Sequence, residues 1–153
     1  MPTNSYLPPD PLLAGKFWIE IQGIVEATFT ECSGLNVETE LQEYAEGGLN
    51  EFVHKLPVRT KYSNVTLKRG FVGSFALWDW YQKAISGYIQ PWDLSIVVSE
   101  NTVHAPGKEK ARWNLHQAYP VKWQGPELRA EGGAVMVETL ELAHRGWDYA
   151  LPK

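Results

Sequence analysis

The feature that most constrains this chain is an alternation of apolar and polar residues with a period of two, repeated along most of its 153 residues. Val37, Thr39 and Leu41 alternate with acidic and amide side chains in one such run. Successive side chains on a β-strand point to opposite faces, so this alternation is typical of strands with one face turned to water. The alternating runs predict strands at residues 17–22, 24–31, 35–44, 61–69, 93–99, 111–118 and 134–144.

A helical period is convincing in only one segment, residues 75–86. Ser74 is a suitable N-cap for this helix, and Gly87 is a suitable C-terminal stop. We expect an apolar stripe, spaced by three and four residues, to cover a sheet, and Trp80 lies outside that stripe. The predicted stripe consists of Phe75, Trp78, Tyr81 or Gln82, and Ile85.

These elements define the expected fold class. Six to eight strands with a single helix, and no alternation of strand and helix, exclude a doubly wound parallel sheet. The prediction is a mainly β fold, an antiparallel β-sandwich or barrel-like domain with one α-helix packed outside. Residues 16–153 are expected to form this single domain. Residues 1–15 contain four prolines and are expected to form a flexible N-terminal arm.

Residues 45–60 interrupt the strand pattern with Gly47, Gly48 and Pro57. We interpret this segment as a loop, much longer than an ordinary hairpin connection. Its apolar residues, Phe52 and Val53 among them, would gain nothing in water. We therefore expect the loop to have a functional role.

The composition excludes several classes of function. A net charge of −4 does not favour binding to the negatively charged phosphates of nucleic acids. Cys32 is the single cysteine, so an intramolecular disulfide is excluded. No signal peptide and no long apolar run is visible, so we expect synthesis and assembly in the cytoplasm, without membrane insertion. Seven Trp, seven Tyr and five Phe suggest contacts between subunits, with a tryptophan-rich monomer core as the alternative.

The residues do not combine into a recognisable catalytic constellation. The four histidines lack the spacing of a zinc site, and the G-x-S-x-G and phosphate-loop motifs are missing. Cys32 at a strand end is more often a small buried hydrophobe than a nucleophile. We therefore predict a protein that is not an enzyme and has no catalytic, cofactor-binding or metal-binding residues.

A string of ordered segments carries a further signal. These are FTECSGLNVETELQEY (29–44), EGGLN (46–50), KLPVRT (55–60), VTLKRG (65–70), LWDW (77–80), AYPVK (118–122) and VETLELAH (137–144). In these segments the chain resembles the phage tail tube protein family, similar to the T4 inner-tube protein and found also in contractile injection systems. The matches span nearly the whole chain from Phe17 onward in one order, which chance rarely produces.

The resemblance implies a structural inner-tube subunit, a virion component or part of an injection particle. Copies would form a hexameric ring in which their strands join into one ring-wide β-barrel, and rings would stack into a hollow tube. The implied partners are other copies, the contractile sheath protein, baseplate and tube-cap proteins, and a DNA or protein cargo in the lumen. No specific nucleic-acid binding is implied.

Residue roles follow from combining the resemblance with the alternation. The polar strand faces would line a hydrophilic lumen: Glu38, Glu40, Gln42, Asn64, Thr66, Lys68, Arg112, Asn114, His116, Thr139 and Glu141. The loop would make contacts between stacked rings through Glu46, Gly47, Gly48, Leu49, Asn50, Phe52, Val53, Leu56, Pro57 and Arg59. Trp78 and Trp80 would serve subunit contacts or helix packing.

Three other readings remain open at this point. The chain could be an antiparallel β-barrel that binds a small apolar ligand among its aromatic residues. It could be a split-barrel enzyme using a flavin, although it has no basic cluster for the cofactor's phosphate. Within the same family, it could form an adaptor ring between tube and baseplate.

Overall fold

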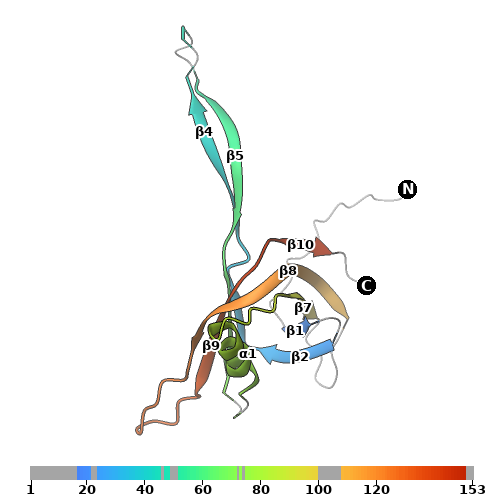
Figure 1. The fold of residues 1–153 in the computed structure, drawn as a ribbon, viewed down its shortest axis with the longest axis vertical. Coiled ribbons are helices and arrows are strands. Elements are labelled where there is room, and N and C mark those ends of the chain that lie inside the picture. Colours follow the sequence, from blue (N-terminus) through green and yellow to red (C-terminus); the bar gives the residue numbers. More distant parts are fainter. Residues whose placement is uncertain are drawn as a thin grey trace, which may run out of the picture.

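The structure, a computed structural model, describes residues 17–21, 24–45, 47–48, 52–71, 73, 75–99 and 108–150. These ranges contain ten strands and one helix (Figure 1). Their bounds are β1 Phe17–Ile21, β2 Ile24–Phe29, β3 Glu31–Ser33, β4 Val37–Tyr44, β5 His54–Tyr62, β6 Val65–Gly70, α1 Ala76–Ile85, β7 Trp92–Ser99, β8 Glu109–Gln124, β9 Val137–Ala143 and β10 Trp147–Ala150. The predicted mainly antiparallel β fold with one helix is confirmed. The predicted arm, residues 1–15, lies outside the described residues.

Eight of the strands form one antiparallel sheet that curves around the core. The strand order is β2-β1-β7-β8-β9-β6-β3, and β10 pairs with β8. The two end strands, β2 and β3, are consecutive in the chain and separated only by Thr30. The sheet must therefore curve enough to bring its two ends together at this residue. The concave side carries the core residues Ile19, Phe29, Val65, Leu67, Leu94, Ile96, Leu115, Ala118, Leu140 and Leu142.

The helix α1 packs on this core with a different face from the predicted one. Leu77 and Trp80 pack against the core cluster, whereas Phe75 and Ile85 are each 61% exposed. Phe75 and Ile85 are therefore wrong as members of the packed stripe, and so is the placement of Trp80 outside it, whereas the predicted member Trp78 contacts Trp123 with ring centroids 4.9 Å apart. Trp80 stacks on Trp92 with ring centroids 5.1 Å apart. Leu77 and Trp80, three residues apart, lie on one side of the helix, and packing selects that side.

The ends of α1 match the prediction at one end only. The N-cap residue is Phe75, which makes no side-chain capping hydrogen bond, and the predicted cap Ser74 lies outside the described residues. At the other end Gly87 has φ +89°, a conformation that glycine adopts without strain. Its N–H donates to the Ala84 carbonyl at 3.2 Å, and the Tyr88 N–H donates to the Lys83 carbonyl at 3.1 Å. The predicted stop at Gly87 is confirmed.

Strands β4 and β5 form a separate two-stranded ribbon that projects from the body (Figure 1). The predicted loop at 45–60 is therefore wrong from residue 54 onward, because 54–60 belong to β5. The predicted strand at 61–69 is divided between the end of β5 and β6. Pro57 is tolerated because the pairing register shifts beside it, opposite Glu40 and Leu41, and because a two-stranded ribbon leaves each strand an open edge.

A carboxylate holds an irregular point of β8 in place. Gln117 has φ +52°, and its backbone N–H donates to Oδ1 of Asp93 at 2.9 Å. This backbone hydrogen bond is the main reason that the pKa of Asp93 is lowered. A carboxyl whose pKa is lower in the folded state adds stability above its unfolded pKa, about 3.9, and this stability is lost as the pH falls through the folded value.

We expect Asp93→Asn to lower the urea midpoint of the unassembled subunit slightly at pH 7. The difference from the unsubstituted chain should shrink as the pH falls below about 4, because the carboxylate is then being protonated in both states. Urea unfolding at pH 7 and pH 3 measures it. Glu131→Gln, an exposed carboxyl between β8 and β9, is the control and should change the midpoint at neither pH. A difference that persists unchanged at pH 3 would contradict the linkage.

Candidate functional site

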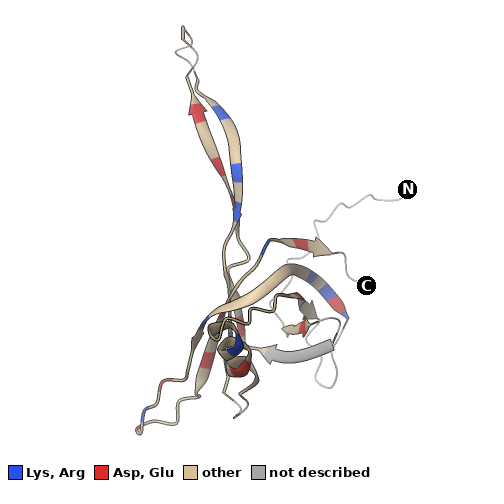
Figure 2. Ribbon diagram, viewed as in Figure 1, with Lys and Arg blue, Asp and Glu red and all other residues tan. Residues whose placement is uncertain are grey.

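The projecting ribbon has one strongly charged face. Pairing of β4 with β5 places Glu38 opposite Lys61 and Glu40 opposite Arg59. Oε2 of Glu40 lies 3.2 Å from Nε of Arg59, and its Oε1 pairs with Nζ of Lys61. The hydrogen bond that Lys61 donates to the Glu40 carboxylate is the main reason that the pKa of Lys61 is raised. Figure 2 shows the segregation of charge, with acidic residues on β4 and basic residues on β5.

The opposite face of the ribbon is apolar over the part near the body, where Thr39 and Thr60 lie between the apolar pairs, and Glu43 and Lys55 follow on the same face toward the tip. Val37 is paired with Tyr62, Leu41 with Pro57, and Val58 is the extra residue at the register shift. Val37, Leu41, Val58 and Tyr62 are between 40% and 57% exposed, because the body covers only the base of the ribbon. Exposed apolar side chains gathered on one face mark an interaction surface more often than isolated ones do. We call this set the apolar ribbon face.

The base of the ribbon fixes how its faces continue into the body. The Tyr62 ring makes edge contacts with His144 and Trp147, at centroid distances of 6.0 and 5.8 Å. A Cβ at Gly146 would lie 3.2 Å from the Tyr62 ring, so a glycine admits this packing. Trp147 and Leu35 pack against the core. The apolar ribbon face therefore continues the core side of the sheet.

The charged face continues into the polar side of β6 and β9. Nδ2 of Asn64 donates to Oε1 of Glu141 at 2.9 Å. Thr66 is paired with Glu141, and Lys68 with Thr139, so these side chains share one side of the sheet. The core residues Val65 and Leu67 alternate with them on the other side. Eight of the predicted lumen residues thus follow one continuous polar surface: Glu38, Glu40, Gln42, Asn64, Thr66, Lys68, Thr139 and Glu141.

The other three predicted lumen residues lie in a different part of the sheet, where β8 pairs with β7 and β10. Nη1 of Arg112 lies 2.9 Å from Glu20, and its Nε lies 2.7 Å from Glu109. These carboxylates, Glu109 first, raise the pKa of Arg112. Asn114 and His116 both bond Asp148, at 2.9 and 2.6 Å, which lowers the pKa of Asp148, with Asn114 as the larger cause. The structure does not bring these residues to the ribbon.

The predicted ring-stacking residues divide between the tip and the side of the ribbon. Gly48, at the tip, has φ +101°, and Phe52 packs edge-on against His54 with centroids 5.0 Å apart. Phe52 and Val53 are about half exposed. Leu56, Pro57 and Arg59 are strand residues of β5 rather than loop residues. Glu46, Leu49 and Asn50 lie outside the described residues.

The described residues contain no group of three or more His, Cys, Asp or Glu side chains placed to hold a metal ion. Burial raises the pKa of the Cys32 thiol to about 11. No helix in the described ranges is long and apolar enough to cross a bilayer.

The similarity to known proteins extends over most of the chain and is not confined to one site. Residues 13–148 match the family described as T4-like virus tail tube protein gp19. A search of curated proteins finds no match.

Solved structures share the fold. A chain of the six-fold-symmetrised anti-feeding prophage baseplate has a TM-score of 0.80 at 23% identity, covering 94% of this chain and 97% of that one. A chain of the extended sheath–tube complex of PVC, an extracellular contractile injection system, has a TM-score of 0.79 at 22% identity, covering 92% of each chain. Hcp1 from Flavobacterium johnsoniae has a TM-score of 0.52 at 16% identity, covering 88% of this chain and 94% of that one. At these identities the likeness shows the fold alone.

Proposed function

Because the chain belongs to the T4-like virus tail tube protein family, we propose that it is an inner-tube subunit of a contractile phage-tail-like particle or injection system. Six copies form a ring, and rings stack into a hollow tube. The observation that carries this proposal is the ribbon with its charged face and its apolar ribbon face. In an isolated subunit the apolar ribbon face is exposed to water, which is unfavourable, so we expect another copy to cover it.

The charged ribbon face and the polar side of β6 and β9 line the lumen. In a ring, each ribbon lies beside the next, and the open edges of β4 and β5 find neighbours. A ring of ribbons closes into one wide barrel with charged side chains inside. Glu40 is already paired with Arg59 and Lys61, so the wall presents mixed, locally neutralised charge. Such a surface keeps a DNA or protein cargo from binding tightly during passage.

The apolar ribbon face packs on adjacent copies. Val37, Leu41 and Val58 are buried there, as in the core of a protein interface. The ribbon tip, with Phe52 and Val53, reaches the neighbouring ring. A contractile sheath, a baseplate and a terminating cap are the further partners, since chains of similar fold occur in a sheath–tube complex, a baseplate and a tube-terminating cap.

An adaptor ring next to the baseplate is the second candidate. A baseplate chain and a sheath–tube chain resemble this chain almost equally, with TM-scores of 0.80 and 0.79. A ligand-binding barrel receives no support from the core, where a cavity of only about 30 Å³ lies among Ile19, Phe29 and Leu67. That volume holds about one water molecule.

Negative-stain microscopy of the purified chain tests the proposal, with rings or tubes as the expected result. A Glu40→Cys variant then tests the lumen. In assembled tubes its thiol should react with a small maleimide but hardly with a maleimide carried on a bulky polymer, whereas in dissociated subunits it should react with both. The same variant in its two states is its own control. A strictly monomeric chain would overturn the proposed function, and rapid bulky labelling of intact tubes would overturn the lumen assignment.

A further inference from the structure

The imidazole of His144, which follows β9, is hydrogen-bonded through both of its nitrogens at the base of the ribbon. Nε2 donates to the carbonyl oxygen of Ser63, the residue after β5, at 2.8 Å, and Nδ1 accepts from the backbone N–H of Gly146 at 3.1 Å. A carbonyl oxygen can only accept and a backbone N–H can only donate, so Nε2 must carry the proton and Nδ1 must be bare. Both hydrogen bonds therefore require the neutral form of His144.

Both backbone partners of the imidazole are themselves held in place. The N–H of Ser63 donates to the carbonyl of Asn36, the residue before β4, at 3.2 Å, so Ser63 joins the two strands of the ribbon at their base. Two backbone hydrogen bonds of 2.9 Å attach residues 145–146 to His116 of β8. These bonds keep the N–H that faces Nδ1 from turning toward another acceptor. His144 thus links the ribbon to the body of the subunit.

Protonation of the imidazole is incompatible with this link. In the charged form both ring nitrogens carry a hydrogen, so Nδ1–H would face the N–H of Gly146 and two donors would oppose each other. Gly146 is buried, so its N–H would lose its acceptor without access to water, which is unfavourable. Histidine is the side chain whose charge ordinarily changes between about pH 5 and 8. Acidification is therefore expected to weaken the link.

Within the described residues, no carboxylate is bonded to this imidazole that could stabilise its charged form. The contacts of His144 are its two backbone partners and the ring of Tyr62. Glu141 is bonded to Asn64, and Asp148 to His116. The ionisable side chains on the surrounding elements are Glu38 of β4, Lys61 and Tyr62 of β5, His116 of β8, Glu141 of β9, Arg145 of the turn and Asp148 of β10.

We propose that His144 is a positioning residue of the ribbon: its neutral form holds the ribbon at one angle to the body, and its protonation releases the ribbon. The eight residues of β4 span about 27 Å, so a tilt at the base is magnified at the tip. The link is a property of the single subunit. Its effect on assembly rests on the proposed function, because a released ribbon no longer presents its two faces to its neighbours in fixed directions. Rings should then form less readily at pH 5 than at pH 7.5.

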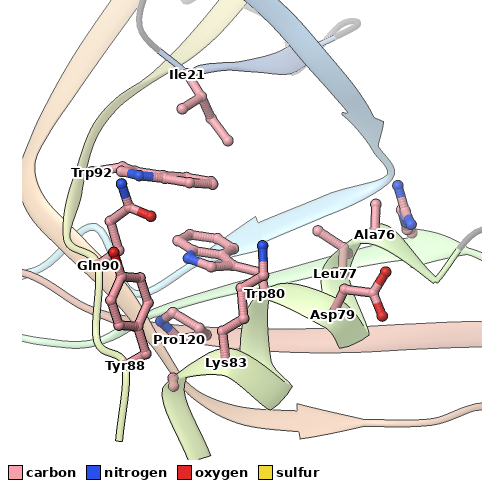
Figure 3. Close-up of a pocket in the computed structure, with 12 residues that line it drawn as sticks. Ile21, Ala76, Leu77, Asp79, Trp80, Lys83, Tyr88, Gln90, Trp92 and Pro120 are labelled. Carbon is pink, nitrogen blue, oxygen red and sulfur yellow. The ribbon is translucent and has the colours of Figure 1, made fainter. Parts of the chain in front are cut away.

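The helix α1 provides an internal reference, because its contact with the sheet does not depend on a histidine. The cleft of about 290 Å³ between α1 and the start of β7 contains the stacked rings of Trp80 and Trp92 (Figure 3). No histidine is among the described residues that line this cleft. The helix should therefore keep its position on the sheet when the ribbon is released.

Distances between pairs of spin labels, measured on the unassembled full chain at pH 7.5 and pH 5, test the proposal. The ribbon pair is Glu43→Cys on β4 with Gln82→Cys on α1, and the body pair is Gln82→Cys with Lys108→Cys, next to the start of β8; all three positions are exposed. Native Cys32 can stay, since burial raises the pKa of its thiol to about 11 and leaves it little reactive.

We expect the ribbon pair to show a second, broader distance population at pH 5. This population should be roughly tenfold more abundant than at pH 7.5, which is the effect on an equilibrium of about one lost hydrogen bond. The body pair should give the same distances at both pH values.

Three variants identify the group that responds to pH. His144→Asn places an amide oxygen near the position of Nδ1, where it can accept from Gly146, but it cannot be protonated, so the ribbon pair should no longer respond to pH. His144→Gln is a second uncharged variant and provides the same test if the asparagine variant does not fold. His116→Asn is the matched control, because it removes a neighbouring histidine side chain and should leave the response intact.

An unchanged ribbon pair in the unsubstituted chain would overturn this inference, and so would a response that persists in a folded His144 variant or disappears in His116→Asn. Sedimentation of the unlabelled chain at the two pH values measures the effect on assembly. A ribbon response without rings at any pH would overturn the proposed function and leave the role of His144 standing. Rings without a ribbon response would do the reverse.

Discussion

Replacing Leu41 with aspartate is expected to abolish ring and tube formation while leaving the fold of the subunit unchanged. Leu41 is 54% exposed in the isolated chain, so a carboxylate at this position remains hydrated in the monomer. In the proposed assembly the apolar ribbon face is covered by a neighbour, and burying an unpaired carboxylate there costs several kcal/mol. Sedimentation velocity and electron microscopy measure assembly, and the melting temperature of the unassembled subunit measures the fold.

The matched control is Gln42→Asp, one residue further along β4 on the charged face. It introduces the same carboxylate on the same strand, but toward the proposed lumen, where water remains. Tubes should therefore persist with Gln42→Asp. Tubes formed by Leu41→Asp at the level of the unsubstituted chain would show that no neighbour covers the apolar ribbon face. Loss of tubes with both variants would show that the two faces are not distinguished as proposed.

The alternation along the chain predicted the strand faces well where one face packs on the core. Val65 and Leu67 are buried, and Thr66 and Lys68 share the polar side with Thr139, as their spacing indicates. Successive side chains of a strand point to opposite faces because of the pleat, so the face of each residue can be predicted from the local sequence alone. The same spacing predicts that Glu38, Glu40 and Gln42 of β4 share one face.

The ribbon shows where local pattern ends. His54 to Tyr62 alternates less clearly, and Pro57 argued for a loop because proline cannot donate to a strand ladder. In a two-stranded ribbon each strand has an unpaired edge, so proline can occupy a position there without breaking a hydrogen bond. Only the structure shows that β4 and β5 are separate from the main sheet. The sequence does not reveal the apolar ribbon face, because Val58 falls in the predicted loop at 45–60 and Tyr62 in the predicted strand at 61–69.

Strand order and helix phase also lie beyond local pattern. Arg112, Asn114 and His116 have the same alternation as the lumen candidates on β6, yet they belong to the part of the sheet beside β7 and β10. For α1, Phe75 with Trp78 and Leu77 with Trp80 are both acceptable apolar pairs in sequence. The core selects the second pair because Trp80 there fills the space beside Trp92. Neither choice can be made without knowing which elements are neighbours.

Removing the carboxylate of Glu138 is expected to have the largest effect on subunit stability. Glu138 is 1% exposed, faces Arg69 across β6 and β9, and accepts hydrogen bonds from Nε of Arg69 and, at 3.2 Å, from Nε1 of Trp123. Glu138→Leu leaves the Arg69 guanidinium nearly buried without its counter-charge. Loss of one partner of a buried pair costs about 3–5 kcal/mol, so the urea midpoint of the unassembled subunit should fall substantially.

The double variant Arg69→Met with Glu138→Leu separates this charge effect from a simple packing defect. Apolar side chains of similar volume replace both charges, so most of the lost stability should return, because neither a cation nor an anion is then buried alone. Urea unfolding of the two single variants and the double variant forms a complete thermodynamic cycle. A double variant as unstable as Glu138→Leu would show that the loss comes from the shape of the site or from the Trp123 hydrogen bond. An unchanged midpoint in Glu138→Leu would show that the pair contributes nothing to stability.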